Sequence, residues 1–391
     1  MRRRLVGRWQ RVFYRFLSIS LKYAALPLIV LAVIIMVVPQ ARAAFHTALF
    51  VTQTLDLPVQ PQSWLTREPV RYEAVYGSEE GSEVADVYRL PDGKPRAAVL
   101  LSIGASPTGL SDATTVNLGK ALARAGFVTM LHWPPDLGRD ADMQRDDPEK
   151  LVRAFEFLTA QDYVDPERTG IGGFSVGGSF AMVAAADPRI RDEVHFINVF
   201  GPYYDLESLI RQAVSRSVVH AGERRPWEPH SLTMRILSHE LIETVDDAED
   251  AAVLTAHFLD GMPVDAAELK ALSLQGSTVA RLIDGVSPRE AETLYFTLPQ
   301  DFRDGLADIS PSNHIEGLRA RLLVMHDRYD RHVPVAESRR LVEAVGDRDD
   351  VRYTEFLSFN HTIPGEGGLL DRIGQAFRLS RHMYDLIRIA R

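Results

Sequence analysis

The stretch "GIGGFSVGGSF", from Gly170 to Phe180, places one serine, Ser175, among four close glycines. A glycine within regular structure costs roughly 0.5–1 kcal/mol relative to alanine, so this segment must require residues without side chains. A strand-like segment precedes the serine and an alanine-rich, helix-like segment follows it. The residues from Gly173 to Gly177 read G-x-S-x-G, which is typical of a sharp strand-to-helix turn that exposes a nucleophilic hydroxyl. A plain glycine-rich turn and a phosphate cradle are the alternatives, although neither phosphate-binding glycine motif is present.

The chain around this turn alternates strand-like and helix-like segments. Residues 97–104 and 127–133 are apolar runs suited to buried parallel strands. Residues 111–126 and 147–158 carry apolar side chains at helical spacing. This alternation predicts an α/β fold with a mostly parallel central sheet flanked by helices. Residues from about 205 to 308 read as consecutive helices between two sheet strands; we interpret them as a helical cap over the site, with a packing layer away from the entrance as the alternative.

A nucleophilic serine needs a base and an acid that orients the base. In this topology the three residues follow one another as Ser, Asp and His. The segment "LLVMHDRYDRHVP" supplies an acid after an apolar strand, either Asp327 or Asp330, and "FLSFNHTIP" supplies His361 after the last strand. His326 and His332 lie in the acid segment, and we interpret them as turn residues.

At these motifs the chain resembles the α/β-hydrolase superfamily, and within it the dienelactone-hydrolase-like, serine-esterase branch. "DPERTGIGGFSVGG" resembles that group's approach to the serine turn, "HDRYDRHVP" its H-G-x-x-D-x-x-V-P segment, and "FNHTIP" its G-H-x-x-P ending. The resemblance covers roughly residues 70–200 and 308–391. It implies a catalytic triad of Ser175, Asp330 and His361.

The sequence departs from the family pattern in the loops around the site. Asp327 stands where the family usually has glycine, and Asn360 replaces the glycine before the base, a position where asparagine tolerates left-handed geometry. The oxyanion hole of such a site uses the N–H of the residue after the nucleophile, here Val176, and a second N–H from the loop after a preceding strand. That loop lacks the family's His-Gly pair; Ala105 is the expected second donor, with Ser106 as the alternative.

The resemblance implies a serine hydrolase that cleaves a small-molecule carboxylic ester or thioester through an acyl-enzyme. We expect no cofactor and no metal, because the chain has no cysteine and no H-E-x-x-H motif. A peptidase or acyltransferase using the same triad is an alternative function. So is a non-enzymatic, membrane-tethered binding module with a degenerate site, since fold does not fix function.

The N-terminal residues 1–44 contain eight of the 44 Lys and Arg residues and none of the 53 Asp and Glu residues. The acidic remainder is unsuited to nucleic acid. Because this basic start leads into the uncharged run 23–38, we expect a retained transmembrane anchor with a cytoplasmic N-terminus and an extracytoplasmic catalytic domain. A buried core helix, or a signal peptide cleaved near the "ARA" of residues 41–43 to give a secreted protein, are the alternatives. We expect a linker over 45–68 and the hydrolase domain over 69–391.

Overall fold

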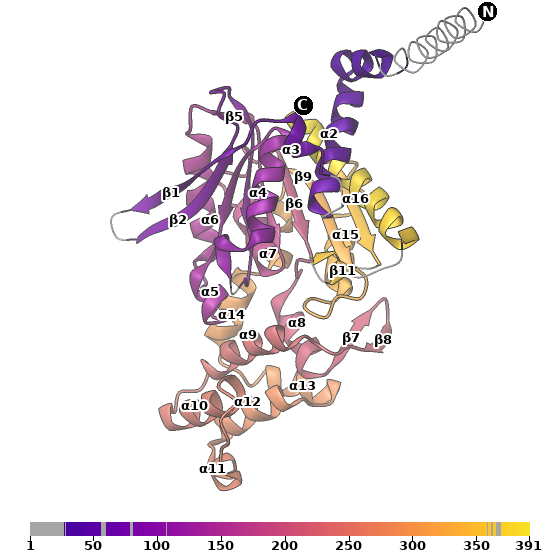
Figure 1. Ribbon diagram of the computed structural model, residues 1–391. Helices are drawn as coiled ribbons and strands as arrows, with labels where there is room; N and C mark the ends of the chain where they lie inside the picture. Colours follow the sequence, from indigo (N-terminus) through magenta and orange to yellow (C-terminus); the bar gives the residue numbers. More distant parts are fainter. Residues whose placement is uncertain are drawn as a thin grey trace, which may run out of the picture.

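The computed structural model of the chain describes residues 27, 29–55, 60–78, 81–106, 108–357, 359–360, 363–364 and 369–391. Its centre is an eight-stranded sheet of order β1-β2-β4-β3-β5-β6-β9-β10 (Figure 1). The pairs β1–β2 and β2–β4 are antiparallel and the other five are parallel, which confirms the predicted mostly parallel sheet. The strands are β1 (Val70–Ser78), β2 (Gly81–Arg89), β3 (Arg96–Ser102), β4 (Val128–His132), β5 (Val164–Phe174), β6 (Phe196–Phe200), β9 (Arg321–Asp327) and β10 (Val351–Phe356).

Helices cover both faces of this sheet, so the central strands bury nearly every residue. On one face, α6 (Asp147–Thr159), α7 (Val176–Ala185) and α15 (Val335–Val345) contribute to one apolar cluster. On the other face, α2 (Pro39–Thr54), α4 (Ala113–Ala125) and α16 (Leu369–Ala390) contribute to a second cluster. The short helices α3 (Gln62–Leu65) and α5 (Pro135–Arg139) lie in connections.

Helix α4 shows how local signals set the element boundaries. The sequence offers Ser111 or Asp112 as the cap of this helix, and in the structure the Asp112 side chain accepts a hydrogen bond from the Thr115 N–H at 3.0 Å. Gly126 ends the helix with a φ of 116°, a left-handed value that suits glycine. In α6 the sequence suggests Asp147 as the cap, but Asp147 is the first helical residue and the N-cap position is Asp146.

The linker expected over residues 45–68 is wrong for its first part, which belongs to helix α2. Buried residues recur along α2 at helical spacing, among them Ala43, Thr47 and Phe50, and this face packs between α4 and α16 (Figure 1). The prolines that suggested a linker begin at Pro58, after α2 has ended, so they gave no signal about the helix before them.

The expected transmembrane segment, residues 23–38, lies only partly within the described residues. Within the described residues, no single helix combines the length and apolarity needed to cross a membrane. A bent pair, Ile29–Val37 followed by α2 at 108°, passes the same test of length and composition. Residues 1–26, which carry most of the basic start, lie outside the described residues.

The insert between β6 and β9 is mainly helical, as predicted, and Figure 1 shows it beyond one end of the sheet. The helix expected at its start ends early, because Arg216 adopts a φ of 50° and the chain then forms a hairpin. The elements are α8 (Leu206–Val214), β7 (Ser217–His220), β8 (Glu223–Pro226), α9 (Ser231–Ile242), α10 (Ala248–Leu254), α11 (Ala266–Ala271), α12 (Leu274–Asp284), α13 (Pro288–Tyr295) and α14 (Gln300–Asp308).

Candidate active site

Ser175 stands between the end of β5 and the start of α7, and its backbone is strained. Its φ of 54° and ψ of −132° are unfavourable for a residue with a side chain, at a cost on the order of 1–3 kcal/mol. The Ser175 N–H donates to the Phe200 carbonyl at 2.8 Å, and its own carbonyl accepts from the Gly178 N–H at 3.0 Å. These bonds from the neighbouring strand and from the helix hold the serine in the turn that the G-x-S-x-G pattern predicts.

The glycines around the serine allow three main-chain segments to touch. A Cβ on Gly173 would lie 2.5 Å from the Ser102 carbonyl oxygen, and one on Gly177 would lie 2.7 Å from the Gly104 nitrogen. Gly104 itself has a φ of 66°, and a Cβ there would meet the Phe174 carbonyl oxygen at 2.6 Å. Side chains at these positions would force the end of β3 away from the turn, so the glycines are a packing requirement.

The two expected oxyanion donors come from segments in mutual contact. Val176 is the first residue of α7, where a main-chain N–H has no partner within the helix. Ala105 follows Gly104 in the loop after β3, and both donors line the same cavity as Ser175. The alternative, Ser106, donates its N–H to the Gly104 carbonyl at 3.0 Å, which favours Ala105.

Two buried aspartates lie at the carboxyl end of β9 and just past it. Asp330 Oδ1 accepts hydrogen bonds from the N–H groups of His332 at 2.6 Å and Val333 at 3.1 Å. Asp327 is the last residue of β9, and its Oδ1 accepts from the Tyr329 N–H at 3.0 Å. Both predicted acid candidates therefore stand at the sheet edge where β5 delivers the serine.

His332 lies in the acid turn, residues 328–334 between β9 and α15, but His326 is a residue of strand β9, so its interpretation as a turn residue is wrong. His326 is fully buried; its Nε2 donates to the Val333 carbonyl at 2.9 Å, so its Nδ1 accepts from the Ser338 hydroxyl at 2.6 Å. The two ring nitrogens of His326 thus join the end of β9 to the acid turn at Val333 and to α15 at Ser338. His332 stacks on His230 of the insert with 4.0 Å between ring centroids, and it lines the cavity.

The expected base, His361, lies outside the described residues. The neighbouring elements β11 (Phe359–Asn360) and β12 (Ile363–Pro364) pair antiparallel and come shortly after β10. Since β5, β9 and β10 all run in one direction, the segments that follow them leave the sheet at a common edge. The order of the strands is therefore compatible with the predicted triad.

The insert is hydrogen-bonded to the acid turn. The Trp227 indole N–H donates to the Asp330 carbonyl at 3.1 Å, and the Thr233 hydroxyl donates to the His332 carbonyl at 3.0 Å. These partners are about a hundred residues apart in the sequence, and no local pattern marks them. The insert and the turn that carries Asp330 consequently form one hydrogen-bonded unit.

A cavity of about 490 Å³ opens at the serine. Ser175, Val176 and Ala105 line it, and the insert supplies an apolar wall of α8 and α9 side chains. Those side chains are Leu206, Leu209, Leu232, Ile236 and Leu237. Such a volume is within the range of small-molecule sites.

A serine on a strained strand-to-helix turn, at the carboxyl edge of a mostly parallel sheet, defines an α/β-hydrolase fold. These features, together with the matches that follow, fit a member of the α/β-hydrolase superfamily of the dienelactone-hydrolase-like kind. It is similar to a probable 2-oxo-3-(5-oxofuran-2-ylidene)propanoate lactonase of Bradyrhizobium sp., at 33% identity over 128 residues, which cover 27% of this chain and 51% of that protein.

Two further similarities cover more of this chain at lower sequence identity. The hydrolyase poxO of Penicillium oxalicum is 29% identical over 171 residues, which cover 41% of this chain and 39% of that protein. The solved acylaminoacyl peptidase of Pyrococcus horikoshii matches 81% of this chain and 42% of its own, with a TM-score of 0.48 and 14% identity. The chain thus spans about half the length, or less, of the curated relatives it matches. No protein-family model matches it.

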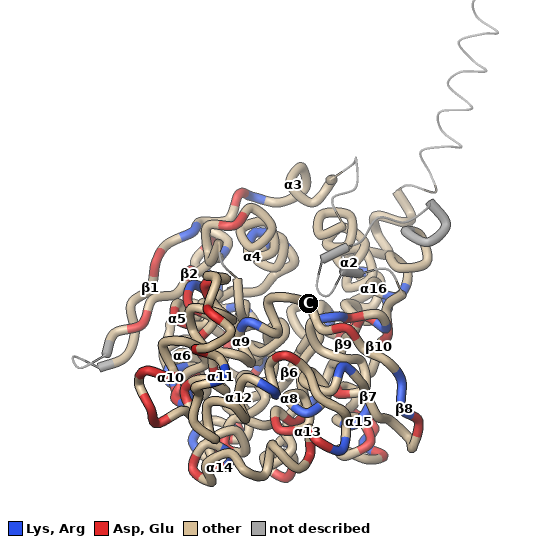
Figure 2. The backbone as a smooth tube through the Cα atoms, turned by 90° about the horizontal axis from the view of Figure 1, so that it is seen from below, with Lys and Arg blue, Asp and Glu red and all other residues tan. Residues whose placement is uncertain are grey.

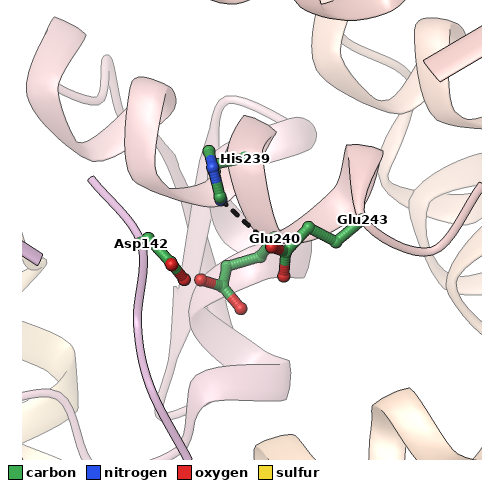
Figure 3. A group of neighbouring side chains, drawn as sticks. All are labelled: Asp142, His239, Glu240 and Glu243. Atoms are coloured by element: carbon green, nitrogen blue, oxygen red, sulfur yellow. Dashed lines mark ion pairs between the residues drawn. The ribbon is translucent and has the colours of Figure 1, made fainter. Parts of the chain in front are cut away.

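A second cluster of titratable groups lies where the insert meets the loop before α6 (Figure 3). Asp142, His239, Glu240 and Glu243 offer metal-ligand atoms that all lie within 4.8 Å of one another. No local sequence pattern predicts this cluster, because Asp142 is distant in sequence from the other three residues. Glu240 is buried and accepts a hydrogen bond from the Met143 N–H at 3.0 Å. Burial raises the pKa of Glu240 to about 8, so a proton on this carboxyl relieves the repulsion among the acids at neutral pH.

The raised pKa of Glu240 predicts a pH-dependent stability. The folded state keeps a proton that the unfolded state releases above a pH of about 4.5, so stability falls as the pH rises from there to about 8. Replacing Glu240 with Gln keeps an acceptor for the Met143 N–H and removes the titration. We expect the melting temperature of Glu240→Gln to fall less between pH 5 and pH 8, by an amount on the order of several degrees, than that of the unmodified protein.

The control for this prediction is Glu193→Gln, which removes an exposed carboxylate. Its melting temperatures should follow those of the unmodified protein across the same pH range. Thermal unfolding followed by circular dichroism provides the measurement. An unchanged pH dependence in Glu240→Gln would contradict the assignment.

Proposed function

We propose that the chain is a membrane-anchored serine hydrolase that cleaves a carboxylic ester or thioester through an acyl-enzyme. The triad is Ser175, Asp330 and His361. The observation that carries the proposal is the strained serine backbone at the start of α7, at the edge of a cavity with apolar walls. A strained conformation that several main-chain contacts maintain is typical of a functional site. The lactonase relative supports ester chemistry, because a lactone is a cyclic ester.

The reaction has two similar steps, the acylation of Ser175 and the hydrolysis of the acyl-enzyme. His361 takes the proton of the Ser175 hydroxyl as its oxygen attacks the acyl carbonyl, and Asp330 orients the imidazole and stabilises its charged form. The N–H groups of Val176 and Ala105 stabilise the tetrahedral oxyanion, each by about 3 kcal/mol. The imidazolium then protonates the leaving alkoxide or thiolate. Water repeats the attack on the acyl-enzyme and releases the acid.

The insert serves as a cap in this proposal. Its α8 and α9 side chains line the cavity, and its hydrogen bonds to the acid turn keep it over the site. Closing the site in this way excludes water and strengthens the electrostatic interactions with the oxyanion. A packing layer away from the entrance would not contribute side chains to the cavity.

The anchor is supported by the sequence and by the surface of the N-terminal helix. The basic start and the apolar run match a cytoplasmic N-terminus followed by a membrane segment. In the structure, the side chains of Ile29–Val37 are largely exposed, for example 66% for Met36 and 71% for Val37. Exposed apolar surface of this kind marks a segment that contacts lipid or another apolar partner.

The anchor can be tested through its topology. A reporter that is active only outside the cytoplasm, fused after Arg391, should be active in cells. The protein should remain in the membrane pellet after a carbonate wash. A soluble product that begins near Ala44 would show instead that the N-terminal segment is a cleaved signal.

The nucleophile can be tested by substitution. Ser175→Ala should reduce ester hydrolysis by at least about a thousandfold, because the members of a triad act as a unit. It should also abolish labelling by a fluorophosphonate probe, with little change in melting temperature. Ser179→Ala, four residues further along α7, is the matched control and should retain labelling. Hydrolysis at the unmodified rate by purified Ser175→Ala would rule out the assigned nucleophile.

The acid can be identified by comparing two conservative variants. Asp330→Asn should lose far more activity, by about a thousandfold or more, than Asp327→Asn, because an amide favours the wrong tautomer of the base. The two side chains are both buried and both accept main-chain hydrogen bonds, so each variant controls for the structural cost of the other. Steady-state hydrolysis of a simple ester measures the difference. The opposite ranking would assign the acid to Asp327.

A further inference from the structure

The cavity at Ser175 extends well beyond the serine and the insert. A second part lies over the sheet face that α2, α4 and α16 cover, and it belongs to the same 490 Å³ space. Its walls are mostly aliphatic and aromatic side chains from all three helices, with Thr54, Thr115 and Asn117 as polar lining residues of α2 and α4. Representative residues are Phe50 and Leu55 around α2, Leu118 and Leu122 of α4, and Leu379 and Met383 of α16.

The position of α2 explains why this space exists. The helix lies between α4 and α16 (Figure 1), and Phe50, Thr54 and Leu55 at its C-terminal end line the cavity. On the α4 side, the Gln53 side-chain amide donates to Asn117 Oδ1 at 2.7 Å, and the Asn117 amide donates to the Gln53 carbonyl at 3.2 Å. These polar contacts fix α2 against α4. The apolar side chains of Phe50 and Leu55 are then free to line the cavity.

The other side of α2 is fixed at the C-terminus of the chain. The Arg391 guanidinium donates to His46 Nδ1 at 3.2 Å and to the Ala125 carbonyl at 2.8 Å. Burial, reinforced by the charge of Arg391, lowers the pKa of His46 to about 4, so its ring is neutral and accepts this bond. The polar contacts of α2 on both sides leave its apolar face to line the cavity.

We propose that this second part of the cavity is a channel for a long hydrocarbon chain, so that the substrate of Ser175 is a long-chain acyl ester. The inference rests on the proposed hydrolase function and specifies its substrate class. An unbranched chain suits a space that leads from a nucleophile between helices and has apolar walls. Each methylene buried there should raise kcat/KM about fourfold until the channel is full.

The surroundings of α2 indicate where such a chain comes from. The helix carries one basic and no acidic residue, and it is largely tan in Figure 2. It joins the exposed apolar helix Ile29–Val37 directly, at a bend of 108°. Helix α2, which lines the channel, is therefore next to the apolar surface that a bilayer would contact. This position favours an ester that is carried in a lipid bilayer over one that is dispersed in water.

The channel can be tested by narrowing it far from the serine. Leu118→Trp adds bulk to the α4 wall, and Met383→Trp does so from α16. Val116→Trp is the matched control, since Val116 is on the same helix, is also half-buried, and does not line the cavity. Circular dichroism and melting temperature establish that each variant is folded. The measured quantity is the ratio of kcat/KM for p-nitrophenyl palmitate to that for p-nitrophenyl acetate, with the palmitate ester presented in detergent or in phosphatidylcholine vesicles.

Narrowing the channel should lower the palmitate-to-acetate ratio at least about tenfold in Leu118→Trp or Met383→Trp, while Val116→Trp keeps it. A higher ratio in vesicles than in detergent would identify a membrane source. A second test uses Leu118→Trp or Met383→Trp combined with Ser175→Ala. Each double variant should bind cis-parinaric acid, a fluorescent long-chain fatty acid, at least about tenfold more weakly than Ser175→Ala alone. An unchanged ratio and unchanged binding in both folded Trp variants would overturn the channel.

Failure of the channel and failure of the hydrolase give different results. If the protein hydrolyses acetate and is labelled at Ser175 but shows no dependence on the Trp substitutions, the hydrolase stands and the channel does not. If it shows neither hydrolysis nor labelling, the hydrolase fails, and the binding of cis-parinaric acid alone decides on the channel. The absence of that binding by Ser175→Ala would then overturn the channel as well.

Discussion

The contact among the end of β3, the end of β5 and the start of α7 is the constraint on which the site depends. Three glycines, Gly104, Gly173 and Gly177, allow main-chain atoms to approach where any side chain would collide. Because these segments touch, the strained backbone of Ser175 cannot relax without moving a sheet strand or the first turn of a helix. The same contact fixes the loop that carries Ala105 against the helix that begins at Val176. One packing requirement therefore sets the positions of the nucleophile and of both expected oxyanion donors.

A second constraint couples the insert to the acid turn. Glu337, fully buried just after that turn, accepts hydrogen bonds from the Tyr204 and Asp205 N–H groups at 3.0 and 3.1 Å, and these residues begin the insert. The Trp227 indole reaches the Asp330 carbonyl from further along the insert. An opening motion of the insert would have to break bonds to the turn that holds Asp330. A substrate that packs against the insert therefore also affects the alignment of the acid.

The parts of this structure that the sequence predicts correctly are those with local causes. The serine turn follows from glycine spacing within five residues, and helix α4 follows from Asp112 at its start and Gly126 at its end. The parts that it does not predict depend on partners far apart in the chain. Helix α2 becomes stable by packing between two helices, the bonds between the insert and the acid turn join distant segments, and the acidic cluster needs Asp142 beside α9. The base, His361, lies outside the described residues, so its part in the triad stays a prediction.

The packing of α2 also changes how the N-terminal segment relates to catalysis. A flexible linker would let the domain move freely relative to a membrane anchor, and the direction in which a substrate approaches would then be unspecified. In the structure, α2 is tied to α4 by the Gln53–Asn117 pair and to the C-terminus by the Arg391–His46 pair. If the preceding apolar run is embedded in a bilayer, this packing fixes which face of the domain is next to the lipid. The face next to the lipid is the one that α2, α4 and α16 form over the apolar cavity. The packing of α2 then determines both the orientation of the enzyme at the bilayer and the substrate that it accepts.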